Sequence, residues 1–136
     1  MIMVATGALQ MLWTGGTRML TGSGPECAVL RAVSGNTVRI HCHKTGFARA
    51  RLVGVEVPDF FAPACREEWF AGIEAWWFLQ LELSRTRIKR IRLQDDKDTA
   101  ILEAHLFLNG ENAARKIIRE GHGRVPGRTF ANHWCE

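Results

Sequence analysis

The chain has 136 residues, a net charge of +4 and a pI near 9.2. This length supports one hydrophobic core and excludes two full-sized domains. Hydrophobic residues make up 46% and charged residues 24% of the chain, which are globular values and exclude wholesale disorder. The mild positive charge allows an anionic partner without requiring one.

The first 24 residues are interpreted as an apolar extension and linker that precede a domain at 25–136. Ile2–Trp13 is mostly apolar, but the first basic residue is Arg18, so the basic start of a secretory signal is missing. Polar residues and glycines interrupt the stretch before it reaches the roughly 20 apolar residues of a spanning helix. We expect it to dock on an apolar protein or membrane surface; a truncated targeting segment is the alternative.

Three runs after the linker have the composition of strands. Cys27–Val33 and Thr37–Cys42 flank a turn at Ser34-Gly35 and predict a hairpin. Ala48–Val57 predicts a third strand that ends at Pro58, because proline cannot donate to a strand ladder.

A long helix is predicted from Pro63 to about Leu83, because proline fits the first turn and Glu67 and Glu68 lie near the positive end of the helix dipole. Its buried stripe is expected at spacings of three and four, at Phe70, Ile73, Trp77 and Leu81. A second apolar set beside this stripe predicts a surface for a protein partner, at Trp69, Trp76, Leu79 and Leu83.

Two further strands and a short helix complete the domain. The strands are predicted at Arg85–Leu93, with Ile88, Ile91 and Leu93 inward, and at Ile101–Leu108, separated by a polar loop at Asp95–Asp98 and followed by a turn at Asn109-Gly110. The helix is predicted at Asn112–Glu120 and ends at Gly121. This order predicts an α+β, mainly β fold: a five-stranded OB-fold barrel with one helix between strands 3 and 4 and one after strand 5.

Several local strings resemble the staphylococcal nuclease (thermonuclease) family, in the family's order and over about residues 26–135. Val33–Ile40 resembles its D-G-D-T-V hairpin, and Arg51–Asp59 resembles its R-L-x-G-I-D-T-P-E signature. Ala104–Gly110 and Ile117–Gly121 are similar to the strand, turn and L-V-R-E-G helix that close its barrel. Two further strings recur in bacterial members believed to be exported, Ala62–Cys65 and Trp134-Cys135.

The resemblance implies a calcium-assisted hydrolysis of phosphodiesters in DNA or RNA. Calcium prefers hard oxygen ligands, arginine forks stabilise the charge on the phosphoryl oxygens, and a carboxylate activates water. Carried over, Arg51 is the first phosphate-clamping arginine and Asp59 replaces the general-base glutamate. Glu56 and Asn36 replace two calcium-ligating aspartates. Glu56 adds a methylene and Asn36 removes a negative charge, so the implied calcium site is weakened.

The second clamping arginine of the family has no counterpart. Asp96–Ile101 places Ile101 at its position, and no arginine occurs between Arg92 and Arg115. Loss of one preorganised donor costs on the order of 100- to 1000-fold in rate. The sequence therefore predicts an SNase-like domain with impaired or lost nuclease activity, a pseudoenzyme that serves as a binding or structural module, in contact with a protein partner or within a larger assembly.

Two other functions remain open. The first is an active calcium-dependent phosphodiesterase that cleaves DNA or RNA; without such activity no cofactor is expected. The second is a non-catalytic nucleic-acid-binding OB domain, because basic OB grooves follow a nucleic-acid backbone. The candidate contacts for this second function are Arg85, Arg87, Lys89, Arg90 and Arg92.

Histidines and cysteines raise two more questions. His41 and His43 share a strand face, but without a third ligand we interpret them as ordinary strand residues rather than a zinc or copper site. The cysteines, at Cys27, Cys42, Cys65 and Cys135, form no C-x-x-C pair. Their even number suits two disulfides and an exported, periplasmic protein; buried free thiols in a cytosolic protein are the alternative. Three pairings are open.

Overall fold

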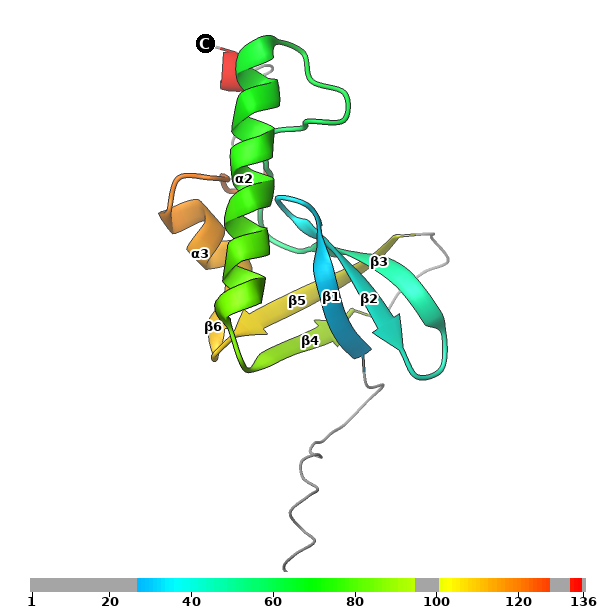
Figure 1. The fold of residues 1–136 in the computed structure, drawn as a ribbon. Helices are drawn as coiled ribbons and strands as arrows, with labels where there is room; N and C mark the ends of the chain where they lie inside the picture. Colours follow the sequence, from blue (N-terminus) through cyan, green and yellow to red (C-terminus); the bar gives the residue numbers. More distant parts are fainter. Residues whose placement is uncertain (1–26, 95–100, 128–132, 136) are drawn as a thin grey trace, which may run out of the picture.

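A computed structural model of the chain describes residues 27–94, 101–127 and 133–135 (Figure 1). In chain order its elements are β1 (Cys27–Ser34), β2 (Thr37–Cys42), β3 (Gly46–Leu52), α2 (Arg66–Arg85), β4 (Lys89–Leu93), β5 (Ile101–Leu108), β6 (Glu111–Asn112), α3 (Ala113–Arg119) and the short 3-10 helix η1 (His133–Cys135). The predicted extension at residues 1–24 and the predicted loop at Asp95–Asp98 lie outside the described residues.

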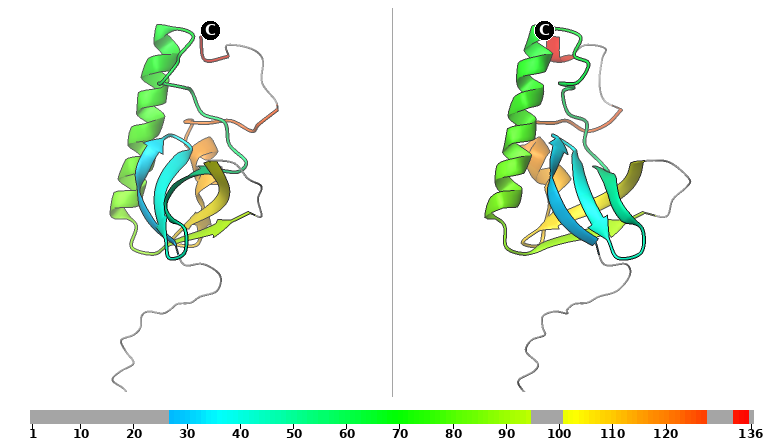
Figure 2. Two further views of the ribbon diagram at one scale, coloured as in Figure 1. Left: turned by 90° about the vertical axis from the view of Figure 1, so that its right-hand side faces the viewer. Right: turned by 45° about the vertical axis from the view of Figure 1, so that its right-hand side comes forward.

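The strands form one mixed sheet in the order β1-β2-β3-β5-β4, with β6 paired to β5. Neighbouring strands are antiparallel except β3 and β5, which are parallel. The sheet curls until β1 and β4, the two ends of this order, are in contact, and Figure 2 shows the resulting half-barrel with α2 along one side. The predicted class is confirmed: a mainly β, α+β fold with a helix between β3 and β4 and one after β5, compatible with an OB-like barrel.

Two predicted strands were too long. The third strand ends at Leu52 instead of Val57, because Gly54 adopts a φ of +94° that turns the chain out of the sheet. Farther along, α2 continues through Arg85, so β4 begins at Lys89 rather than Arg85. Ile88 then lies outside the strand and is 61% exposed, and its predicted inward orientation is wrong.

Helix α2 begins at Arg66, three residues later than predicted from Pro63. Cys65 is the N-cap, and its Sγ accepts a hydrogen bond from the backbone N–H of Glu68. The Glu68 carboxylate accepts hydrogen bonds from the backbone N–H groups of Asp59 (3.0 Å) and Ala64 (2.8 Å). The loop that precedes the helix is therefore fixed by a side chain from the first helical turn.

The buried face of α2 differs from the predicted stripe. Gly72 and Ala75 both approach other parts of the fold closely. A Cβ on Gly72 would lie 2.8 Å from the Phe60 Cβ, and a Cβ on Gly35 would lie 2.7 Å from the Ala75 Cβ. Phe70 and Trp77, predicted to be buried, are 53% and 52% exposed. Small residues mark the face that approaches the barrel, whereas counting hydrophobicity alone selected the aromatic face.

Two core residues of α2 complete this face, Leu79 and Leu83, which are 1% and 5% exposed. They pack with the inward side chains of the sheet and of α3, including Val38, Ile40, Leu106 and Ile117. No helix in the described ranges is long and apolar enough to span a membrane.

The four cysteines form two disulfides. Cys27–Cys42 joins directly opposite positions of β1 and β2. Cys65–Cys135 joins the start of α2 to η1, which lies beside the end of the helix that extends beyond the barrel (Figure 1). With sequence separations of 15 and 70, loop-closure entropy gives about 3 and about 4 kcal/mol of stabilisation. Two disulfides indicate an oxidising environment.

The C-terminal part of the domain follows its predicted turn and cap signals. Asn109 and Gly110 both have positive φ, 52° and 87°, and form the tight turn between β5 and β6. Helix α3 ends at Arg119 with Glu120 as its C-cap, and Gly121 follows at positive φ, as expected of the predicted stop signal. The helix is held to α2 by an ion pair of 2.8 Å between Lys116 and Glu82. On the surface, a hydrogen bond from Arg119 lowers the pKa of Glu111.

Candidate functional site

Arg51, the predicted phosphate clamp, lies on the outer face of β3 and is bound within the fold. It is directly opposite Glu103 of β5, and its Nη2 lies 2.9 Å from the Glu103 carboxylate. Both side chains are about half exposed, at 51% and 48%. A phosphate would have to compete with this carboxylate for the guanidinium group.

Glu56, the predicted calcium ligand, pairs with an arginine from the C-terminal part of the chain. Its backbone exchanges two hydrogen bonds of 2.9 Å with Arg124, and its carboxylate lies 3.5 Å from the Arg124 Nε. The Arg124 guanidinium also lies over the Trp134 ring, 4.5 Å from the centroid. A positive charge held beside the carboxylate opposes the binding of a divalent cation there.

Asn36 and Asp59 both take part in local backbone structure. The Asn36 Oδ1 accepts hydrogen bonds from the hydroxyls of Ser34 and Thr37, and its Nδ2 donates to the Val55 carbonyl. The Asp59 carboxylate accepts hydrogen bonds from the two backbone N–H groups of residues 61 and 62, at 2.8 and 3.1 Å. Such contacts close turns and need no ligand.

The place of the missing second clamp is defined by the strand register. Ile101 of β5 is directly opposite Arg49 of β3, two residues before Arg51 on the same face. The guanidinium nearest to this position in the register therefore belongs to Arg49, a residue that the family resemblance did not select.

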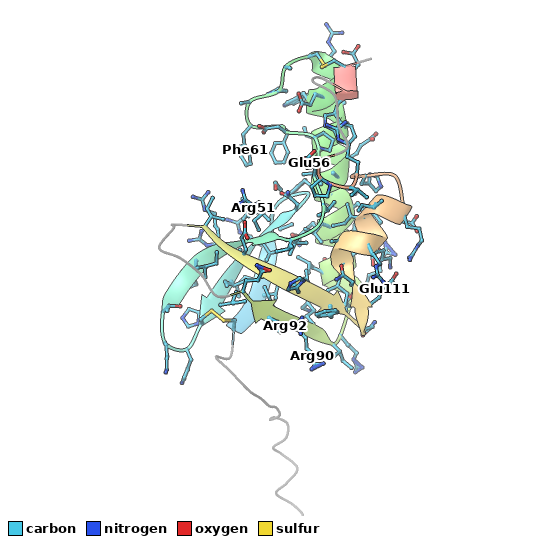
Figure 3. All side chains as sticks on the ribbon, turned by 180° about the vertical axis from the view of Figure 1, so that it is seen from behind. Arg51, Glu56, Phe61, Arg90, Arg92 and Glu111 are labelled. Atoms are coloured by element: carbon cyan, nitrogen blue, oxygen red, sulfur yellow. A yellow bond between two sulfur atoms is a disulfide. The ribbon has the colours of Figure 1, made fainter. Side chains whose placement is uncertain are left out.

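The predicted basic run is not one continuous strand face. Arg85 belongs to α2, and Lys89 caps that helix by donating to the carbonyls of Leu83 and Thr86. Arg87 lies between the two elements and is exposed. Figure 3 shows the remaining members, Arg90 and Arg92 of β4, along the lower edge of the barrel, away from Arg51 and Glu56 in the upper part of the view.

The predicted docking residues of α2 are divided between two faces. Leu79 and Leu83 are core residues, so their assignment to a docking surface is wrong. Trp76 is half-buried and donates from Nε1 to the Ala32 carbonyl of β1. Trp69 is 40% exposed and remains a candidate for contact with a partner.

The histidine pair does not come together with other metal-binding side chains. The His41 ring packs edge-on against Phe47, and the intervening Cys42 is bonded to Cys27. Within the described ranges, no group of three or more His, Cys, Asp and Glu side chains is placed to hold a metal ion.

A groove of about 640 Å³ lies where α2 and the loop before it face β1, β2 and β3. Its cationic side consists of one arginine from each strand, Arg31, Arg39 and Arg49. Its apolar side consists of Val33, Phe60, Phe61, Ile73 and Trp76. None of the three arginines was selected from the sequence.

A β-bulge explains why the groove could not be predicted. Counting back from the Ser34–Thr37 pair at the hairpin turn places Arg31 opposite Ile40, whose side chain is inside the barrel. A register shift between Ala32 and Ser34 changes this partner to Arg39, and the two arginines then share the outer face. Nothing in the sequence signals this shift.

The chain matches no protein-family model and no curated protein. Its fold and contacts define a curled, disulfide-bonded half-barrel of OB-like arrangement with an arginine-lined groove.

Proposed function

We propose that this chain is a thermonuclease-type (SNase-like) domain that no longer cleaves nucleic acid and acts as a binding module in contact with a protein partner or a larger assembly. The motif order in the sequence supports the ancestry, and the strand order β1-β2-β3-β5-β4 agrees with it. The two disulfides support an exported, periplasmic location.

The observation that carries this proposal is the ion pair between Glu56 and Arg124. The family's chemistry needs a calcium ion at this carboxylate, but a guanidinium occupies its neighbourhood at 3.5 Å. Asn36, the other counterpart of a calcium ligand, is neutral and hydrogen-bonded to its own hairpin. These residues do not fit a calcium site, so we derive no catalytic step through the metal.

A second argument comes from the phosphate clamp. Arg51 is paired with Glu103, and Ile101 stands at the position of the second arginine. Among the described residues around Arg51, no two guanidinium groups without an acidic partner are therefore placed at these two family positions to bind one phosphate. Even the loss of one such donor lowers hydrolysis rates by on the order of 100- to 1000-fold.

Incubation of the purified protein with single-stranded DNA, duplex DNA and RNA tests the proposal. We expect no cleavage above background in calcium, and no difference between calcium and a chelator. Arg51→Ala should behave like the unchanged protein. The matched control is Arg119→Ala, because Arg119 is equally exposed and also paired with a glutamate, Glu111. Calcium-dependent cleavage that Arg51→Ala abolishes and Arg119→Ala preserves would overturn the proposal.

One observation favours an active nuclease as the second candidate. Arg49 lies opposite Ile101 and next to Arg51 on the same strand face, so it is placed to supply a second guanidinium from a new position. If the domain is a nuclease, Arg49→Ala should reduce cleavage as strongly as Arg51→Ala. If Arg49→Ala and Arg51→Ala both cleave as fast as the unchanged protein, neither guanidinium contributes to cleavage, and a nuclease site built on these two arginines is excluded.

A further inference from the structure

Three arginines form a row across the outer face of the sheet. In the strand register, Arg31 of β1 is opposite Arg39 of β2, and Arg39 is opposite Arg49 of β3. Their chain neighbours Ala32 and Ala50 are buried inside the barrel, so the arginines point outward. Like charges directly opposite each other destabilise a sheet, and the row therefore has a cost in folding free energy.

No acidic side chain offsets this cost in the described part of the chain. The ion pairs there use Arg51, Lys116, Arg119 and Arg124 but none of the three arginines of the row. Residues that line the groove opposite the row are apolar, including Ile73 and Trp76 of α2. Arg39 lies over the Phe47 ring, 5.7 Å from the centroid, and Arg31 donates to the Ala32 carbonyl at 3.5 Å, but neither contact neutralises charge. The groove thus combines cationic charge that no described acidic side chain neutralises with an apolar wall.

The row is short and has apolar ends. Its span across three strands is about 10 Å, because neighbouring strands lie about 4.8 Å apart. Beyond Arg49 the next residue in register is Ile101, and beyond Arg31 lies Trp76, which donates to the β1 backbone. The site therefore suits a few negative charges rather than the continuous charge of a polymer backbone.

An exposed aromatic stripe continues from the groove along α2. Trp69, Phe70 and Trp77 are 40%, 53% and 52% exposed, and they lie at helical spacings from Ile73 in the groove wall. Phe61, which also lines the groove, is 69% exposed and lies in the upper part of Figure 3. A contiguous apolar surface of this kind marks an interaction site, and Trp and Arg are the residues most enriched in binding hot spots.

We propose that the groove and the aromatic stripe bind an acidic segment of a partner protein. Its carboxylates pair with the arginine row, and its aliphatic or aromatic side chains pack on Phe61, Ile73 and Trp77. This inference rests on the proposed function as a binding module and specifies the chemistry of its partner. The partner gains ion pairs that the fold itself does not supply, and it covers the apolar stripe.

Charge complementarity favours a foreign segment over the other occupants. Residues 1–25 of this chain contain no Asp or Glu and one Arg, so they do not match a cationic row. A second copy carries the same net charge of +4. For nucleic acid, the row spans only about 10 Å and is followed in register by Ile101, so it offers no continuous path for a phosphate backbone.

Binding of a fluorescein-labelled peptide in which glutamate alternates with leucine and phenylalanine tests this proposal by fluorescence anisotropy. We expect Arg39→Glu to weaken binding about 10-fold or more, because it reverses the centre of the row. The control Arg90→Glu changes an exposed arginine on β4 and should alter the Kd less than about 2-fold. Replacing leucine and phenylalanine by serine in the peptide should also weaken binding about 10-fold.

Arg39→Glu is not expected to misfold, since it replaces two like-charge contacts by attractive ones, and its thermal unfolding temperature should not fall. Equal peptide binding by the unchanged protein and Arg39→Glu would overturn the proposal. So would tighter binding of oligothymidylate of equal charge, or self-association that Arg39→Glu abolishes. Calcium-dependent cleavage would overturn the proposed function instead, so the two failures are distinguishable.

Discussion

Two arginines on the same strand illustrate how differently the two regions of the outer face are built. Arg51 lies at the nuclease-like corner and has Glu103 directly opposite it, at 2.9 Å. Arg49, two residues earlier on the same face, has Arg39 on one side and Ile101 on the other. At the corner, charges are neutralised inside the fold; in the groove they are not. Residue type is the same in both regions, so the cross-strand partner decides which arginine is available to a ligand.

The two regions also differ in what holds them in place. The corner is closed by contacts between side chains of β3, β5 and the segment around Arg124. The groove is closed by α2, whose outer half extends beyond the barrel and is tied to η1 by the Cys65–Cys135 disulfide (Figure 1). Loss of this disulfide should therefore affect the groove wall and also the corner, because Trp134, next to Cys135, lies over the Arg124 guanidinium.

The largest expected effect comes from removing this tie with Cys65→Ser and Cys135→Ser together. Loss of a crosslink that spans 70 residues should lower the free energy of unfolding by about 4 kcal/mol, measured by urea denaturation. The matched control, Cys27→Ser with Cys42→Ser, removes a span of 15 residues and should cost about 3 kcal/mol. A smaller loss for the first pair would show that the groove wall does not depend on the longer crosslink.

The next largest effect is expected when substitutions on the buried and the exposed face of α2 are compared. Leu79→Ala should cost about 3 kcal/mol, because Leu79 is 1% exposed and truncation leaves a cavity in the core. Trp77→Ala removes a larger side chain that is 52% exposed, and it should change the free energy of unfolding by less than about 1 kcal/mol. Thermal or urea unfolding measures both losses. A larger loss for Trp77→Ala than for Leu79→Ala would contradict the assignment of Trp77 to the exposed aromatic stripe.

Much of the fold could be predicted from local signals. β2 and β5 have the predicted bounds, and the turn at Asn109-Gly110 and the cap at Gly121 have the positive φ that their residues suggest. These signals work because their cause is local: strand composition, or a backbone conformation that glycine and asparagine favour. The buried face of α2 was mispredicted because its cause is tertiary. Gly72 is buried because Phe60 and Pro58 of the preceding loop approach it.

The candidate site was less accessible to sequence reasoning. The resemblance identified Arg51 and Glu56 by position, but their partners Glu103 and Arg124 come from distant parts of the chain. Those pairings depend on strand register and on the path of the C-terminal segment, which no local motif specifies. The arginine row depends likewise on the register shift between Ala32 and Ser34 of β1.

A smaller effect is expected from the hydrogen bond that joins Trp76 of the groove wall to the backbone of β1. Trp76→Phe removes the indole N–H that satisfies the Ala32 carbonyl of β1 at 3.1 Å. We expect a loss of about 1 kcal/mol in the free energy of unfolding, since one partly buried hydrogen bond is lost while the ring is largely retained. Trp69→Phe is the control, because Trp69 is on the exposed stripe. Equal losses in both variants would show that the indole bond contributes nothing to this edge.

The smallest effect is the most direct test of the comparison, because it predicts opposite signs. Arg49→Gln removes repulsion from Arg39 and should raise the free energy of unfolding by about 0.5 kcal/mol. Arg51→Gln removes the exposed ion pair with Glu103 and should lower it by about 0.5 kcal/mol. Both changes should shrink in high salt, which screens exposed charges. Urea denaturation at low and high salt measures them, and a common sign for the two variants would mean that the arginines of groove and corner are equivalent after all.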